Sequence, residues 1–215
     1  MVVAVVVTKL SDHSCARQVI SEICILERMS HTNVIKLLDV YCMGRATRLI
    51  FEHGGRSLRQ VLHSLGAQDV SIVQNLMRQL LRAVAYIHGH DVIHNDLKPS
   101  NVLLDDGSVL RVADFGSSTI DRVGWRFLPS ELTIQKKGLR EMTAWYRAPE
   151  VILGNASYAR SVDLWSSGCI MSELVRARPL FNFGEIATEQ MIGQIYATVG
   201  KPSNAVLNDH TRILF

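Results

Sequence analysis

The chain has 215 residues, of which 47% are apolar, with 14 glycines and 5 prolines. This composition excludes collagen-like, low-complexity and disordered chains, because such chains lack the apolar surface that offsets the entropy lost on ordering. The length is sufficient for a buried core in one domain or in two small lobes. The 23 basic and 20 acidic residues are spread along the chain and give a net charge of +3. No basic run therefore indicates a nucleic-acid or membrane surface, and we expect neither partner.

The cysteine pattern predicts free thiols. There is no C-x-x-C pair and no histidine at metal-ligand spacing, so we expect no structural zinc site. Reduced thiols indicate an intracellular protein, in the cytoplasm or the nucleus. The apolar residues 1–7 lack a basic leader and a small-residue cleavage site, so we expect a buried strand there and not a signal peptide or membrane span. The four cysteines are Cys15, Cys24, Cys42 and Cys169.

The first fifty residues predict a small sheet with one helix. Residues 2–7 are β-branched and suit a strand. Val19, Ile23 and Leu26 recur at helical steps of three and four, which indicates an amphipathic helix. The predicted order is strand 2–7, helix 14–28, strand 34–41 and strand 48–52, with a turn at 43–44 before the last strand.

After residue 53 the pattern becomes mostly helical. Residues 53–56 read H-G-G-R and have linker character. Residues 117–143 have no clean period, which predicts a long functional loop. We therefore expect an α+β protein with a small lobe at 1–52 and a larger lobe at 53–215, and a ligand site in the crevice between them. The elements predicted for the larger lobe are helices 57–65, 71–88, 161–176 and 188–199 and strands 102–104 and 110–112. Ser57 is expected to cap the first of these helices. The second has apolar residues that recur on one face, namely Ile72, Leu76, Leu80, Val84 and Ile87.

The densest group of reactive side chains lies in residues 94–104, which read H-N-D-L-K-P-S-N-V-L-L. Asp96, Lys98 and Asn101 fall within six residues of loop, and the sequence Asp114-Phe115-Gly116 begins thirteen residues after Asn101. Lysine provides a point charge for a transferring phosphoryl group, and Asp with Asn provides the oxygen ligands that Mg²⁺ prefers. The remaining carboxylate can orient a hydroxyl nucleophile and accept its proton. We expect His94 to be a packed, hydrogen-bonded core histidine and not a proton carrier.

This arrangement resembles the protein kinase family, whose catalytic loop reads H-R-D-L-x-x-x-x-N and whose metal-binding turn reads D-F-G. The A-P-E at 148–150 and the D-L-W-S-S-G at 163–168 are similar to two further family motifs, in the family's order. In the family the first residue of the second motif braces the backbone of the catalytic loop. The resemblance implies a bilobal kinase fold, ATP and Mg²⁺ as cofactors, and a protein substrate.

The resemblance also indicates a subgroup. Lys98 in D-L-K-P-S-N is the serine/threonine form, and residues 143–153 and 193–203 are similar to the cyclin-dependent and MAP kinases, the CMGC group. In that group the residue that matches Arg147 helps to form a pocket for a proline just after the phosphoacceptor. The resemblance therefore implies transfer of the ATP γ-phosphoryl group to Ser or Thr hydroxyls, with proline-directed substrate choice.

Each matching residue receives a role from the resemblance. Asp96 would be the catalytic base, Lys98 would steady the γ-phosphate, and Asn101 and Asp114 would hold Mg²⁺. In the nucleotide site the strand residue Lys9 would pair with the helix residue Glu22. Phe51, Glu52 and Gly54 fall where the gatekeeper and the hinge lie, and Leu103 would lie beneath the adenine ring. The residues assigned to that site are Lys9, Glu22, Phe51, Glu52, Gly54 and Leu103, and those assigned to the substrate pocket are Thr143 and Arg147.

Two registers are open for the strand lysine. If residues 3–5 match the family's V-A-I-K, Val6 stands where the lysine belongs, whereas matching residues 5–9 supplies Lys9. Strand side chains alternate, so Val6 and Lys9 face opposite sides unless a bulge intervenes. We favour Lys9, because a valine would leave the Glu22 carboxylate without its partner.

Three departures from the family pattern bear on activity. Asn95 replaces the arginine that normally grips a phosphothreonine, and Gly138 stands at the position of that threonine. Ordering of the loop is therefore expected from other contacts or from a regulatory protein, cyclin-like or other. The glycine-rich phosphate loop and the last helices have no match, which predicts a kinase domain truncated at both ends. An alternative hypothesis is thus a pseudokinase or kinase fragment that acts as a protein-binding module.

Overall fold

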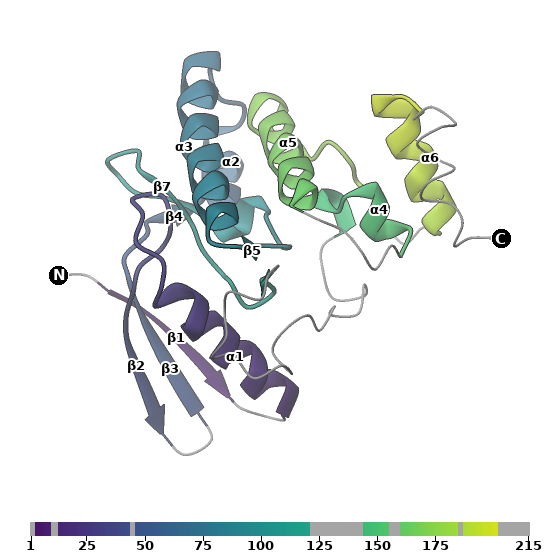
Figure 1. Cartoon of the computed structure of the whole chain (residues 1–215). Coiled ribbons are helices and arrows are strands. Elements are labelled where there is room, and N and C mark those ends of the chain that lie inside the picture. The colour runs from purple at the N-terminus through teal and green to yellow at the C-terminus, as the bar shows by residue number, and fades with distance from the viewer. Residues whose placement is uncertain are drawn as a thin grey trace.

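The computed structural model (Figure 1) describes residues 3–9, 13–43, 46–120, 144–154, 160–184 and 187–201. Within these ranges the chain forms a small antiparallel sheet with one helix and a larger, mainly helical part. This is the α+β fold with two unequal lobes that the order of elements predicts. Among the described helices, none is both long enough and apolar enough to cross a lipid bilayer.

The small lobe is a three-stranded antiparallel sheet with the strand order β1-β3-β2. Helix α1 (His13–Leu26) follows the first strand, and Figure 1 shows it beside the sheet. The type and order of all four elements agree with the sequence prediction, and their bounds differ from it by up to three residues. The strands are β1 (Val3–Lys9), β2 (Leu37–Met43) and β3 (Ala46–Glu52).

Alternation along β3 decides which face of this sheet is buried. Leu49 and Phe51 are buried, whereas Arg48 is exposed. Antiparallel pairing places Ala4 opposite Phe51 and Val6 opposite Leu49. Directly opposed residues share a face of the sheet, so Ala4 and Val6 lie on the same face as the two buried side chains. Val6 is nevertheless 49% exposed and Val5 is 52% exposed, so the prediction of a buried strand was wrong for these two residues.

The larger lobe is built from helices, of which α3 and α5 pack against each other (Figure 1). The bounds of α5 and α6 agree with the predicted ranges. The short helix α4 was not predicted, because four residues are too few to show a helical period. The helices are α2 (Leu58–Leu65), α3 (Val70–Gly89), α4 (Pro149–Ile152), α5 (Ser161–Arg176) and α6 (Thr188–Val199).

Helix α2 begins at a reciprocal cap that confirms the prediction for Ser57. Ser57 Oγ accepts a hydrogen bond from Gln60 N at 3.3 Å, and Gln60 Oε1 accepts one from Ser57 N at 2.9 Å. Both donors would otherwise lack a partner at the helix start. The cap fixes where the chain turns from the hinge into the helical lobe.

The apolar stripe of α3 faces the core with one exception. Leu76, Leu80, Val84 and Ile87 are buried as predicted, but Ile72 is 44% exposed. Ile72 lies in the first turn at the edge of the stripe, and the adjacent Val73 occupies the core position instead. The prediction for Ile72 was therefore wrong.

Short strands lie beside and between the two segments that carry the candidate site residues, 94–101 and 114–116. Strands β6 and β7 have the predicted bounds. Strand β8 begins inside the region predicted as loop, and it pairs with β5; residues 121–143 of that region lie outside the described residues. The loop prediction was thus wrong at residues 119–120, where a two-residue strand has no local sequence signal. These strands are β4 (Arg56–Ser57), β5 (Val92–Ile93), β6 (Val102–Leu104), β7 (Leu110–Val112) and β8 (Thr119–Ile120).

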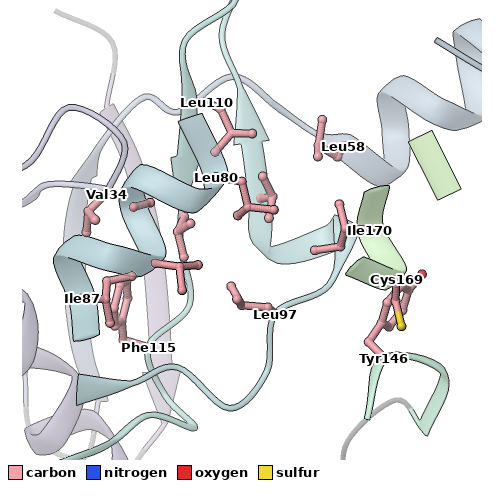
Figure 2. Packing of buried hydrophobic residues seen from close by; sticks show 14 of the residues in the cluster. Val34, Leu58, Leu80, Ile87, Leu97, Leu110, Phe115, Tyr146, Cys169 and Ile170 are labelled. Carbon is pink, nitrogen blue, oxygen red and sulfur yellow. The ribbon is translucent and has the colours of Figure 1, made fainter. Parts of the chain in front are cut away.

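One hydrophobic core runs beneath the catalytic loop. Leu80 and Ile170 are fully buried, and Leu97 of the loop belongs to the same cluster of buried side chains (Figure 2). Leu97 is 1% exposed although its neighbours Asp96 and Lys98 are polar and only partly buried. Burial of this side chain therefore anchors the loop and leaves the two flanking side chains on its open side.

We expect Leu97→Ala to lower the free energy of unfolding by about 2–5 kcal/mol, because it leaves a cavity in a closely packed core. Urea unfolding followed by circular dichroism measures this. Leu65→Ala is the matched control, since Leu65 is 68% exposed at the end of α2. Equal losses in the two variants would contradict the anchoring role of Leu97.

Candidate active site

A buried carboxylate holds the backbone of the catalytic loop. Asp163 on α5 is 1% exposed. Its Oδ2 accepts a hydrogen bond from His94 N at 2.8 Å, and its Oδ1 accepts one from Asn95 N at 2.9 Å. His88 Nε2 lies 2.8 Å from the same Oδ2. The bracing role expected for Asp163 is confirmed, whereas the contribution of His88 was not predicted.

Asp96, Lys98 and Asn101 form one hydrogen-bonded group directly after this braced segment. Lys98 Nζ donates to Asp96 Oδ2 at 2.7 Å. Asn101 Nδ2 donates to the same oxygen at 3.2 Å and to the Asp96 carbonyl oxygen at 3.0 Å. Among the described residues, Asp96 Oδ1 receives no hydrogen bond. One oxygen is thus fixed by two donors, and the other is available to accept a proton from a hydroxyl group.

Asn101 and Asp114 are brought together by a backbone contact. Ala113 N donates to Asn101 O at 2.9 Å, which places the start of the D-F-G turn beside the catalytic loop. Asp114 has the left-handed φ of 66°, which turns the chain sharply at this point. Asn101 Nδ2 donates to Asp96, and its Oδ1 accepts a 3.4 Å hydrogen bond from Ser100 Oγ. A carbonyl oxygen has two lone pairs, so Oδ1 keeps one for a metal ion.

These two residues fit a magnesium ion bound together with a nucleotide. Mg²⁺ commonly takes one or two protein oxygen ligands and completes its shell with phosphates and water. Asn101 and Asp114 supply ligands of that type and number. Among the described residues, no three acidic, histidine or cysteine side chains cluster as a preformed metal cage.

His94 is a packing residue. It is fully buried, and its ring meets that of Phe115 edge to face at 5.0 Å. Its Nε2 lies 3.1 Å from Ala113 O, and its Nδ1 accepts from Asp96 N at 3.3 Å. The prediction of a hydrogen-bonded core histidine is confirmed. His94 therefore joins the catalytic loop to the D-F-G turn, through its ring contact with Phe115 and its hydrogen bonds to Ala113 and Asp96.

Glu22 on α1 reaches the D-F-G turn from the small lobe. Its Oε2 and the Oδ1 of Asp114 lie 3.7 and 3.4 Å from the point where a side chain on Gly116 would begin. Burial, together with the nearby charge of Asp114, raises the pKa of Glu22 to about 7, and a hydrogen bond from the Phe115 backbone offsets only part of this. No ion pair joins Glu22 to another described side chain.

The comparison with known families agrees with this geometry. The family model described as protein kinase domain matches residues 1–211. The chain belongs to the protein kinase family. The match supports an ATP-binding phosphotransferase with a protein substrate, while the choice of acceptor residue and the subgroup are taken up below.

The lysine of the kinase nucleotide site is still a prediction. The observed register places Val6 opposite Leu49 and Ala4 opposite the gatekeeper position Phe51. Lys9 pairs with Ala46 at the far end of β1, and its side chain lies outside what the structure describes. In the described part of the site the Glu22 carboxylate therefore lies near that of Asp114. Its pairing with Lys9 stays a prediction.

The residues predicted for the hinge pack closely against the residue predicted to lie under the adenine ring. A Cβ on Gly54 would lie 2.5 Å from Leu103 Cδ1, so Gly54 and Leu103 are in direct contact. A Cβ on Gly55 would lie 2.1 Å from the Leu104 carbonyl oxygen, and Gly55 has a φ of +85°. Only glycine meets both conditions at that position. The side chain of Glu52 is fixed by a hydrogen bond, because its Oε1 accepts from Lys36 N at 2.9 Å.

The substrate side of the kinase site is described in part. Thr143 and Gly138 lie outside the described residues. Arg147 directly follows the turn Ala144–Tyr146 and is partly buried. Nearby, Tyr146 Oη donates to Glu173 Oε2 at 2.6 Å. Burial first, and then this bond, raises the pKa of Tyr146.

Tyr146 and Glu173 line a cavity of about 220 Å³ that also touches Lys98, Trp145 and Arg59. The cavity connects the catalytic loop with α2 and α5. Sequence reasoning missed this pair, because 27 residues separate them and neither position shows a local pattern. Burial raises the pKa of Glu173, which Tyr146 and Arg59 partly oppose.

Glu22 predicts a specific pH dependence of stability. Its pKa is 4.5 in the unfolded chain and about 7 in the folded kinase, so the folded state binds more protons between these values. The free energy of unfolding should therefore fall as the pH rises from 4.5 to 7, by on the order of 2–3 kcal/mol from this group. Below pH 4.5 and above pH 7 the contribution is constant.

We expect Glu22→Gln to remove this slope. Urea unfolding at pH 5, 6, 7 and 8 should show the variant gaining stability relative to the wild type as the pH rises. Glu27→Gln is the control, because Glu27 is exposed just beyond the end of α1. A stability difference that stays constant across the four pH values would contradict the shifted pKa.

Proposed function

We propose that this kinase is a serine/threonine protein kinase of the cyclin-dependent and MAP kinase type. It transfers the γ-phosphoryl group of Mg·ATP to Ser or Thr hydroxyls, with a preference for acceptors followed by proline. One observation carries the proposal: Asp96, Lys98 and Asn101 form a single hydrogen-bonded group on a loop that Asp163 braces. Polar residues so arranged stabilise the fold less than apolar ones would, so their use is chemical.

Each residue has a separate task in this reaction. Asp96 orients the acceptor hydroxyl and receives its proton through Oδ1. Lys98, held 2.7 Å from Asp96, places a positive charge where negative charge develops on the transferring group. Asn101 and Asp114 would hold the metal. When bound, Mg·ATP supplies the phosphoryl group and the neutralising cation. The protein thus contributes mainly positioning and charge.

The acceptor and sequence preferences are supported by motif and position. Lys98 lies two residues after Asp96, as in the serine/threonine form of the catalytic loop. Arg147 follows the turn that carries Trp145 and Tyr146, next to the cavity beside Lys98. A substrate segment that crosses this region would place the residue after the acceptor near Arg147.

We expect Asp96→Asn to lower kcat for a protein or peptide substrate by about 10²–10⁴-fold, because removal of a general base has this effect. Transfer of radiolabel from γ-labelled ATP in the presence of Mg²⁺ measures it. Asp106→Asn is the control, since Asp106 lies in the exposed turn between β6 and β7. Equal labelling by the wild type and Asp96→Asn would refute the enzyme assignment.

Proline direction has its own test. Paired peptides that differ only in the residue after the acceptor, Ser-Pro against Ser-Ala and Thr-Pro against Thr-Ala, should differ at least about tenfold in kcat/KM, because a shaped pocket for one apolar ring contributes about 1–3 kcal/mol. A matched Tyr-Pro peptide should not be labelled. Equal rates for the Pro and Ala peptides would remove the proline preference and leave the kinase assignment intact.

A second function is favoured by the surroundings of Glu22. In the described part of the site this carboxylate lies beside Asp114, a second carboxylate, and has no cationic partner. A kinase that cannot neutralise this pair would bind Mg·ATP weakly and act as a protein-binding module, with a regulatory partner on its helical lobe. Thermal shift with ADP and Mg²⁺ separates the two functions, because stabilisation that is lost in Asp114→Asn supports the enzyme.

A further inference from the structure

We propose that Asn95 is a positioning residue whose uncharged side-chain amide ties the catalytic loop to the segment that follows the D-F-G turn. The inference rests on the proposed phosphoryl transfer and adds to it one of the contacts that hold the two halves of the site together, beside the His94–Ala113 hydrogen bond and the β5–β8 pairing. In this chain the amide stands where the family has an arginine.

The contacts of Asn95 come from three strand and turn segments. Its Nδ2 donates to Thr119 Oγ1 at 2.9 Å, to Ser117 O at 3.0 Å and to Ile93 O at 3.3 Å. Two of these acceptors are carbonyl oxygens, which cannot donate, so the orientation of the amide follows from its partners. Its backbone N donates to Asp163 Oδ1. One residue therefore bonds α5, β5 and β8 at once.

The backbone at Asn95 is suited to this role. Its φ is +67°, in the left-handed region that asparagine adopts more readily than most residues. The amide Oδ1 is buried without a hydrogen-bond partner among the described residues, which costs stability. An apolar side chain would avoid that cost, so the bonds donated by Nδ2 explain why an amide stands here.

Asn95 and one of its partners lie close in sequence to the two carboxylates of the candidate active site. The next residue is Asp96, and Ser117 follows Asp114 by three residues. Pairing between β5 and β8 consists of two residue pairs only, and so short a ladder is marginal by itself. The Asn95 amide extends that pairing and thereby sets the spacing between the carboxylates of Asp96 and Asp114.

A neutral amide needs no opposite charge. Its three acceptors are a hydroxyl and two backbone carbonyls, so none of these bonds depends on a phosphate group. The start of the segment after the D-F-G turn is therefore held in place without phosphorylation. This supplies the ordering contact that the absence of the arginine and of its threonine target requires.

Four variants of the whole chain test the proposal. Asn95→Gly removes the amide without backbone strain, because glycine accepts a positive φ. Thr119→Val removes one acceptor with little change of shape, and Thr119→Ser keeps the hydroxyl. Thr198→Val is the matched control, because Thr198 Oγ1 donates to Gln194 O on the distant helix α6.

Hydrogen exchange gives a readout that does not depend on activity. Amides of residues 117–120 should exchange at least tenfold faster in Asn95→Gly and several-fold faster in Thr119→Val, with no change in Thr119→Ser or Thr198→Val. Exchange over α3 should stay at the wild-type level, which separates local release from general unfolding. Unchanged exchange at 117–120 in Asn95→Gly would overturn the proposal, and so would a Thr119→Ser variant as perturbed as Thr119→Val.

The kinetic readout distinguishes positioning from mere stability. In the labelling assay, Asn95→Gly should lower kcat at least tenfold while the KM for ATP stays within about threefold. The double variant Asn95→Gly/Thr119→Val should be no worse than Asn95→Gly alone, because both remove one contact. If the wild type transfers no phosphate, the proposed function fails, and the exchange data still decide whether Asn95 holds the segment.

Discussion

The catalytic site of this kinase depends on one buried negative charge. Asp163 is almost inaccessible to water, and a carboxylate there is tolerated only because donors surround it. Two of those donors are the backbone N–H groups of His94 and Asn95, the residues just before Asp96. The need to satisfy the carboxylate therefore fixes the backbone from which the catalytic side chain projects. Helix α5 acts on the site through this contact and without touching Asp96.

The hydrophobic core acts on the same loop from below. Leu97 is buried among core residues and His94 is packed edge to face on Phe115. Buried side chains thus hold the loop at His94 and Leu97, and the partly buried Asp96 and Lys98 on either side of Leu97 are left on the open side. Close packing permits few alternative positions for these side chains.

Electrostatics at the junction of the two lobes has a different character. Glu22 comes from the small lobe and Asp114 from the large one, and their mutual repulsion, added to burial, raises the pKa of Glu22. Two acids at one junction favour a cation between them, whether a side chain or a metal with its nucleotide.

The sequence by itself determined the elements with strong local patterns and the residues with strong motifs. The bounds of α5, α6, β6 and β7 followed from local residue patterns, and the roles of Asp96, Lys98, Asn101 and Asp114 followed from the resemblance of their segments to kinase motifs. Only the tertiary structure decided the partners of Asn95, the contact between His88 and Asp163, the pair Tyr146–Glu173, and strand β8. The physical reason is that periodicity and motif spacing are properties of neighbouring residues. A hydrogen bond between residues up to 75 positions apart exists only after distant segments have packed, and one sequence contains no signal that pairs them.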